Sequence, residues 1–191
     1  MQGFGQHLRS HERFLLEKGT AMNTEDVVAL LGYSYWATEI ILDAASQVSP
    51  TQFVSSIVPD PGRGSLRGIL VHMLDTEISW RQIVQKMELS PDLVEQDFPD
   101  VATLGTRWAM ERENWFSFCR NLSPEALNNT YTYQFNNGPA RTRLVWQTIL
   151  HVVNHGTQHR SEAAYLLTGY GHSPGDLDFN YYLHIQSGVS A

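Results

Sequence analysis

The 191-residue chain contains a single cysteine, Cys119. One cysteine excludes an intramolecular disulfide, and it also excludes a structural zinc site built from several thiolates. Cys119 follows the aromatic segment Trp115–Phe118. We therefore interpret it as a small buried apolar residue rather than as a reactive thiol.

Basic residues are also scarce. The chain has 13 Lys and Arg against 20 Asp and Glu, which gives a formal net charge of −7 at pH 7. Because the basic residues are scattered and form no block, the chain lacks the broad positive field that holds nucleic-acid phosphates. We therefore expect no nucleic-acid partner.

Long apolar runs are missing as well. None approaches the roughly 20 consecutive apolar residues of a membrane span, and the N-terminal segment has no apolar core of signal-peptide length. We therefore expect a cytoplasmic protein with no membrane partner. Residues 1–22 are polar and aperiodic, so we expect a loosely ordered extension before one domain at 23–191.

Apolar residues recur at helical spacing in four long segments, at about 23–47, 65–87, 101–121 and 144–167. Ser-Pro pairs and the segment 59–62 lie between them, and we interpret these as breaks. The connections exceed the two to eight residues of a simple up-down bundle. The pattern therefore predicts an all-α four-helix bundle with at least one long crossover connection.

A different pattern separates the third and fourth helical segments. Residues 131–135 include alternating β-forming residues, and Asn136-Asn137-Gly138 follows them. This order is typical of a short β-hairpin. The segment Arg141–Arg143 would be its return strand or the lead into the fourth helix.

Three of the eight histidines, His151, His155 and His159, lie four residues apart in the fourth helical segment. Four residues advance an α-helix by about 400°, so these side chains form one stripe. Two imidazoles at this spacing can bind one metal ion, as in the HExxH zinc helix. Gly156 follows His155, so the general-base glutamate of that motif is absent.

The second helical segment offers one more ligand, His72, inside the apolar run 69–74. Burying an imidazole without a partner costs free energy, and a metal shared with the stripe would satisfy it. The stripe spans about 12 Å, too far for all three of its histidines to bind one ion. The pair is therefore either His151 with His155 or His155 with His159. A solvent-facing stripe without metal is the alternative.

Three motifs resemble the DinB family of metalloenzymes. They are Tyr33-Ser34-Tyr35-Trp36-Ala37, the segment Ser65–Met73 with Glu77 and Trp80, and the segment His151–Arg160, which is similar to HxxNHxxxHRGQ. The resemblance covers residues 24–183 and departs from the family at Ser161-Glu162, where Gly-Gln is common. It implies an antiparallel four-helix bundle that is often dimeric.

The resemblance also implies the ligands of a divalent metal: one histidine from the second helix and two from the fourth. Carried onto this sequence, they are His72, His155 and His159, and His151 is left out. Nearby polar residues are candidates for orienting a ligand ring through its second nitrogen, with a solvated surface role as the alternative for each. These candidates are Asn154, Glu162, Asp75 and Glu77.

Three neutral imidazoles suit Zn²⁺, Ni²⁺, Co²⁺ or Fe²⁺ and leave a position for a thiol or water. Characterised members of the family include bacillithiol- and mycothiol-dependent transferases and isomerases. The resemblance therefore implies a metal-dependent thiol S-transferase-like enzyme, a homodimer that uses a low-molecular-weight thiol and a small-molecule substrate. The alternatives are a metal-dependent hydrolase and a non-catalytic, stress-related metal-binding or dimerisation protein.

Overall fold

The computed structural model describes residues 22–57, 63–135 and 138–188. The predicted mostly helical fold with a small antiparallel hairpin is confirmed. Within these residues the long helices are α2 (Thr24–Ala45), α4 (Leu66–Val84), α5 (Val101–Arg120) and α7 (Val145–Gly169). The predicted N-terminal extension lies outside the described residues, apart from Met22.

Polar capping residues set the starts of three long helices. Asn23 caps α2 and forms a capping box with Asp26, in which each side chain accepts a backbone N–H of the other residue. Ser65 caps α4 and Asp100 caps α5 in the same side-chain-to-amide way. Because these caps are visible in the sequence, the predicted starts lie close to the observed ones.

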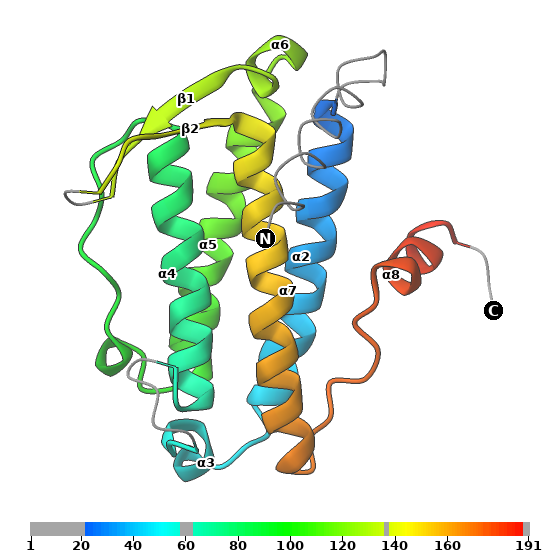
Figure 1. Ribbon diagram of the computed structural model, residues 1–191. Coiled ribbons are helices and arrows are strands. Elements are labelled where there is room, and N and C mark those ends of the chain that lie inside the picture. Colours follow the sequence, from blue (N-terminus) through cyan, green and yellow to red (C-terminus); the bar gives the residue numbers. More distant parts are fainter. Residues whose placement is uncertain (1–21, 58–62, 136–137, 189–191) are drawn as a thin grey trace, which may run out of the picture.

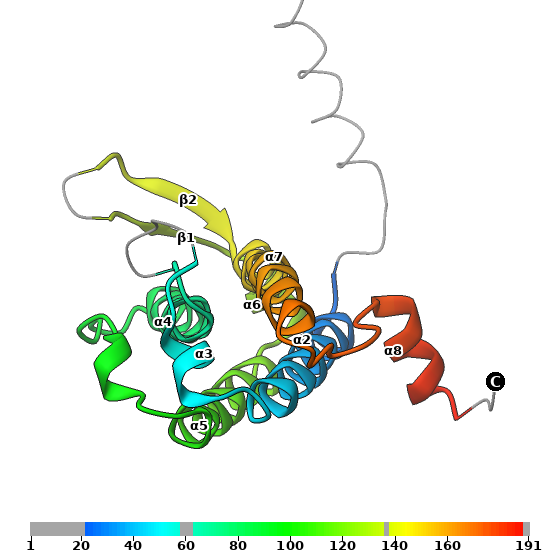
Figure 2. The same cartoon turned by 90° about the horizontal axis from the view of Figure 1, so that it is seen from below.

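The four long helices pack in a ring in which α2 and α4 each contact both α5 and α7 (Figure 2). Helices α2 and α7 run in one direction, and α4 and α5 run in the other (Figure 1). Since α4 and α5 are parallel, the connection 85–100, with the 3₁₀ helix η1 (Glu95–Asp97), returns along the length of the bundle (Figure 1). Leu31, Leu70, Trp115 and Ile149, one from each helix, are buried between them.

Two Ser-Pro pairs that we interpreted only as breaks each begin a short helix. Ser49 caps α3 (Pro50–Val54), and Ser123 caps α6 (Pro124–Leu127). Proline suits the first helical position because its missing N–H has no partner there in any helix. A Ser-Pro pair can therefore end one segment and start another helix at once.

The predicted hairpin consists of β1 (Thr130–Tyr133) paired antiparallel with β2 (Arg141–Leu144). The residues 136–137 of the predicted turn lie outside the described part of the chain. The hairpin packs beside the end of α4, where the Trp80 and Tyr133 rings lie 5.2 Å apart between centroids. It therefore covers one end of the seam between α4 and α7 (Figure 2).

Aromatic rings join the C-terminal helix α8 (Phe179–Gln186) to α2. The buried Tyr182 ring lies 5.4 Å from Trp36 and 5.9 Å from Tyr33, measured between centroids. The rest of α8 projects from the bundle (Figure 2). By length and composition alone, α2 is apolar enough to span a membrane, but its packing against α5, α7 and α8 is that of a core helix.

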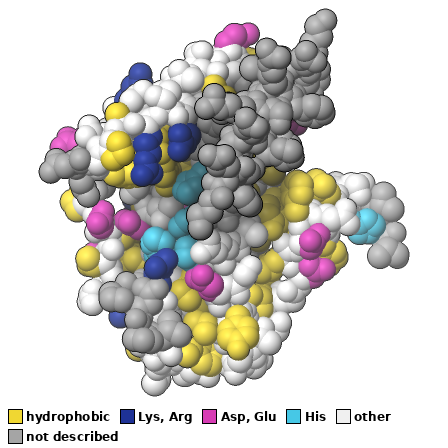
Figure 3. Space-filling view, in the orientation of Figure 1, with side chains coloured by type: hydrophobic (Ala, Val, Ile, Leu, Met, Phe, Trp, Pro, Cys, Tyr) yellow, Lys and Arg dark blue, Asp and Glu magenta, His cyan; other side chains and the backbone are white. Residues whose placement is uncertain are grey.

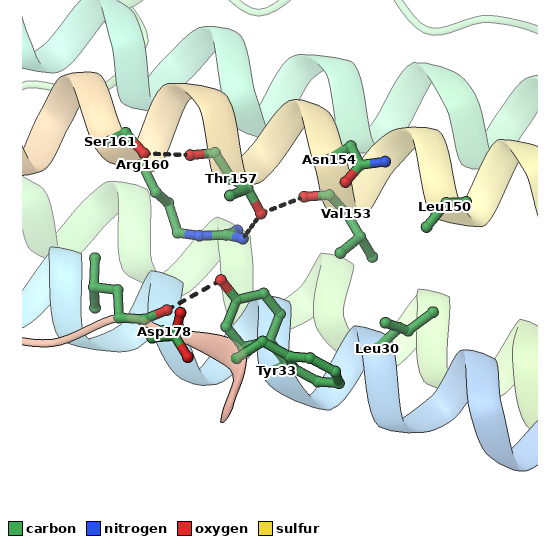
Figure 4. Close-up of a pocket in the computed structure, with 11 residues that line it drawn as sticks. Leu30, Tyr33, Leu150, Val153, Asn154, Thr157, Arg160, Ser161 and Asp178 are labelled. Carbon is green, nitrogen blue, oxygen red and sulfur yellow. Dashed lines mark hydrogen bonds between the residues drawn. The ribbon is translucent and has the colours of Figure 1, made fainter. Parts of the chain in front are cut away.

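A buried arginine fastens α7 to α2 (Figure 4). Arg160 is 2% exposed and donates hydrogen bonds to the hydroxyls of Ser34 and Thr157, each at 2.9 Å. Its guanidinium also lies over the Tyr33 ring. Gly156 leaves the space for it, because a Cβ there would lie 2.7 Å from an Arg160 guanidinium nitrogen. Arg160 is thus a structural residue of the α2–α7 contact.

A buried ion pair between α4 and α5 gives a direct test of this packing. Arg81 contacts the Glu111 carboxylate at 2.5 Å and 2.9 Å, and Glu111 is 0% exposed. Glu111→Ala leaves a buried guanidinium without its carboxylate, so the free energy of unfolding should fall by about 3–5 kcal/mol in urea titrations. The exposed Glu113→Ala on the same helix should change it by less than about 0.5 kcal/mol. Equal losses of stability in Glu111→Ala and Glu113→Ala would contradict a stabilising role for the buried ion pair.

Candidate metal centre

Three histidine rings meet where α4 packs against α7. Ring centroids lie 5.0 Å apart for His72 and His155, 4.8 Å for His72 and His159, and 4.4 Å for His155 and His159. One ring nitrogen of each histidine lies within 4.8 Å of those of the other two. The two α7 histidines share a helix face because they are four residues apart, and α4 supplies the third ring from across the seam.

The donor set fits a divalent metal ion. Zinc binds imidazole nitrogens at about 2.0–2.1 Å, so tetrahedral ligand nitrogens lie about 3.4 Å apart. The candidate nitrogens lie within 4.8 Å of one another, so a bound ion would draw the three rings closer together. Among the described residues, no fourth His, Cys, Asp or Glu completes the cluster. Three histidines with no further protein ligand leave a coordination position for an exchangeable molecule.

The environment of His155 keeps its imidazole neutral. Burial, and then repulsion from His159 and His72, lowers the pKa of His155 from 6.5 to about 3, with smaller contributions from His151 and Arg63. A neutral imidazole keeps the lone pair that a metal ion requires. Protons therefore do not compete for this nitrogen near neutral pH.

Glu162 orients one of the candidate ligands. Its carboxylate lies 2.6 Å from Nδ1 of His159, whose side chain is almost fully buried. A carboxylate at this nitrogen accepts the Nδ1–H, which leaves the lone pair on Nε2 of the same ring for the metal. The two residues are three positions apart on α7, a spacing that places them on one face.

Glu77 lies in the core rather than at the histidine cluster. Its buried carboxylate accepts hydrogen bonds from the Tyr35 hydroxyl at 2.9 Å and the Trp108 indole N–H at 3.2 Å. Burial is the largest cause that raises the pKa of Glu77 to about 7. These partners come from α2 and α5, so Glu77 ties α4 to the opposite side of the bundle.

The two remaining candidates also have other surroundings. The Asp75 carboxylate accepts a hydrogen bond from the Leu93 backbone N–H at 2.8 Å and thereby holds the α4–α5 connection against α4. Asn154 is exposed. Of the four predicted orienting residues, Glu162 contacts a candidate ligand ring, Asp75 lines a pocket together with His72, and Glu77 lies in the core.

His151 lies at the edge of the cluster. Its ring centroid is 5.8 Å from that of His155 and 4.9 Å from that of Trp80. It is outside the group whose nitrogens converge, which consists of His72, His155 and His159. The structure therefore brings together the pair His155 and His159 from the stripe.

Three pockets border the centre. In the surface view of Figure 3, histidine side chains lie at the surface near basic side chains. The hairpin pocket is lined by residues that include Trp80, Tyr133, Arg141, Arg143, Trp146 and His151. The apolar pocket is lined by residues that include Ile57, Arg63, Ile69, Glu162, Tyr165 and Leu166. The acidic pocket contains His72 with Asp75, Asp92 and Glu95. That Arg63, Arg141 and Arg143 line pockets was not predicted from the sequence, although the alternation Arg-Thr-Arg is visible in the return strand.

A helical fold in which three imidazoles converge from two helices defines a bundle protein with a candidate metal centre. The chain belongs to the DinB family, because the family model matches residues 22–189, most of its length. A search of curated proteins gave no match.

We expect the hydrogen bond from His159 to Glu162 to increase the affinity of the centre for a metal ion. Glu162→Ala frees the His159 ring to rotate and to change tautomer, so zinc affinity should fall by about 10–100-fold. Competition with a chromophoric chelator measures this change. Asn154→Ala removes a side chain that is exposed and should leave the affinity within about twofold of the wild type. Unchanged zinc affinity in Glu162→Ala would disprove the orienting role.

Proposed function

We propose that this protein is a metal-dependent thiol S-transferase-like enzyme whose divalent ion is held by His72, His155 and His159. The observation that carries the proposal is the convergence of these three imidazoles with no fourth protein ligand among the described residues. A divalent metal held there would lower the pKa of a thiol or water at the remaining position. The family resemblance favours a thiol over water.

The proposed reaction joins the sulfur of a small thiol to an electrophilic carbon of a second substrate. The new S–C bond forms as the bond from that carbon to its leaving group breaks. The leaving group departs with the electron pair of that bond, and the thiol proton is released to solvent or to the leaving group. The net change is therefore a substitution that needs no oxidant or reductant.

The thiol has to come from a small molecule, because the chain's own thiol is inaccessible. Cys119 on α5 is fully buried, which confirms the sequence interpretation. Burial also raises the pKa of Cys119 to about 12, so the nucleophilic thiolate is scarce at neutral pH. Helix α5 packs against α2 and α4, whereas the candidate ligands lie in the seam between α4 and α7.

The apolar pocket is a candidate binding site for the electrophilic substrate of the proposed reaction. It has a volume of about 590 Å³ and adjoins the centre through Glu162, which contacts His159. Its wall includes Ile69 and Leu166, side chains that favour the apolar part of a small electrophile. Such a substrate would lie beside the position where the thiol binds.

A purely structural metal site is the main competing function. Structural zinc sites are normally closed by four protein ligands, whereas catalytic sites keep a position open. The described cluster has three histidines and is bordered by pockets, which supports an enzyme. We further propose a cytoplasmic homodimer without nucleic-acid or membrane partners. The net charge of −7 supports the absence of nucleic acid, and the family resemblance supports the dimer.

A thiol-conjugation assay tests the proposal directly. The wild type loaded with zinc or nickel should conjugate a thiol to a model electrophile, whereas the chelator-treated protein and His155→Ala should be more than about 100-fold slower. His184→Ala on α8, a histidine remote from the centre, should match the wild type. Equal turnover in the loaded protein, the chelator-treated protein and His155→Ala would refute a metal-dependent enzyme.

A further inference from the structure

We propose that the hairpin pocket binds the anionic end of the thiol substrate, which is therefore a small thiol with at least one carboxylate. The pocket has a volume of about 540 Å³, and its lining includes Trp80, Tyr133, Arg141, Arg143 and His151. This inference rests on the proposed function, because it assigns a binding site to one of the two substrates.

The strand pairing gathers both arginines on one face of the hairpin. Arg141 and Arg143 are two positions apart on β2, so their side chains leave the strand on the same side. The register places Arg143 opposite Tyr131 and Arg141 opposite Tyr133, and directly opposed residues share a face. Tyr131 is buried and contacts Thr148 of α7. The face that carries the arginines is therefore the one turned toward the bundle.

The two arginines present positive charge that the described protein does not neutralise. Both side chains are exposed, and neither forms an ion pair with any described residue. Arg143 donates one hydrogen bond to the Thr142 carbonyl at 2.9 Å. Guanidinium groups have several donors in a planar array that matches a carboxylate. A pair of them lining one pocket in a chain of net charge −7 favours an anionic ligand there.

An aromatic wall leads from the arginines to the histidine cluster. The Trp80 ring contacts Tyr133 at 5.2 Å and His151 at 4.9 Å between centroids, and His151 lies 5.8 Å from His155. A ligand that lies along this wall with its carboxylate at the arginines directs its other end toward His155. The hairpin pocket can thus hold the body of a thiol while its sulfur reaches the centre.

The other two pockets suit different chemistry. The acidic pocket contains Asp75, Asp92 and Glu95 beside His72, so its carboxylates would repel an anion. The apolar pocket has one arginine, Arg63, which already has another interaction. The hairpin pocket is therefore the one whose charge matches a carboxylate.

Calorimetric titration of the zinc-loaded full chain tests the inference, with glutathione as a carboxylate-bearing thiol and its diethyl ester as the esterified counterpart. Arg141→Gln/Arg143→Gln should raise the Kd of glutathione by at least about tenfold, since it removes charge-assisted hydrogen bonds, and leave that of the diester within about twofold. Each single variant should give a smaller increase. Arg112→Gln/Arg120→Gln, the same charge change at exposed positions of α5, should bind glutathione like the wild type.

The zinc content of the same samples separates this inference from the proposed function. If the wild type holds zinc but binds glutathione and the diester equally, or if Arg141→Gln/Arg143→Gln binds glutathione normally, the inference is overturned and the metal proposal stands. If the wild type holds no zinc, the binding of S-methylglutathione, whose sulfur is blocked, tests the carboxylate site independently of the metal. Weaker binding of it to the double variant than to the wild type would support the inference, and equal affinities or no binding would overturn it.

Discussion

The packing of α4 against α7 is the constraint on which the candidate centre depends. Neither helix alone brings three imidazoles together: α7 contributes two at helical spacing, and α4 contributes His72 from across the seam. Burial keeps His155 neutral, and Glu162 fixes the orientation of His159. Interactions that hold the two helices in register therefore also set the geometry of the nitrogens.

The chain path places the other two long helices away from this seam. Helices α5 and α2 lie on the side of the bundle away from the α4–α7 seam (Figure 1, Figure 2). The hairpin inserted before α7 then covers one end of the seam and brings two arginines and Tyr133 beside it. Buried polar contacts such as Glu77 with Tyr35 and Trp108 hold the opposite side together. The opposite side is thus held by buried polar contacts, whereas the hairpin pocket and the acidic pocket lie beside the seam.

Sequence patterns predicted the local structure well, because capping and periodicity are local. They yielded the four long helices, the hairpin and the histidine stripe, but they left His151 and His159 as alternatives for the metal. That choice depends on how far α4 is shifted and rotated relative to α7, which no single helix encodes. Glu77 could have been set aside: five residues after His72, it lies about 140° around the helix from it. The position of Arg141 and Arg143 beside the seam depends on how the hairpin packs on the bundle, and the Arg-Thr-Arg alternation alone does not predict it.

Metal content measured on purified protein tests the central claim most directly. Elemental analysis should find about one divalent ion per wild-type chain after zinc loading and desalting, and less than about a tenth of that in a folded His72→Ala variant. His72 is the informative position because it is the candidate ligand contributed by α4. A wild type that retains no metal, or a His72→Ala variant that retains as much as the wild type, would contradict the account.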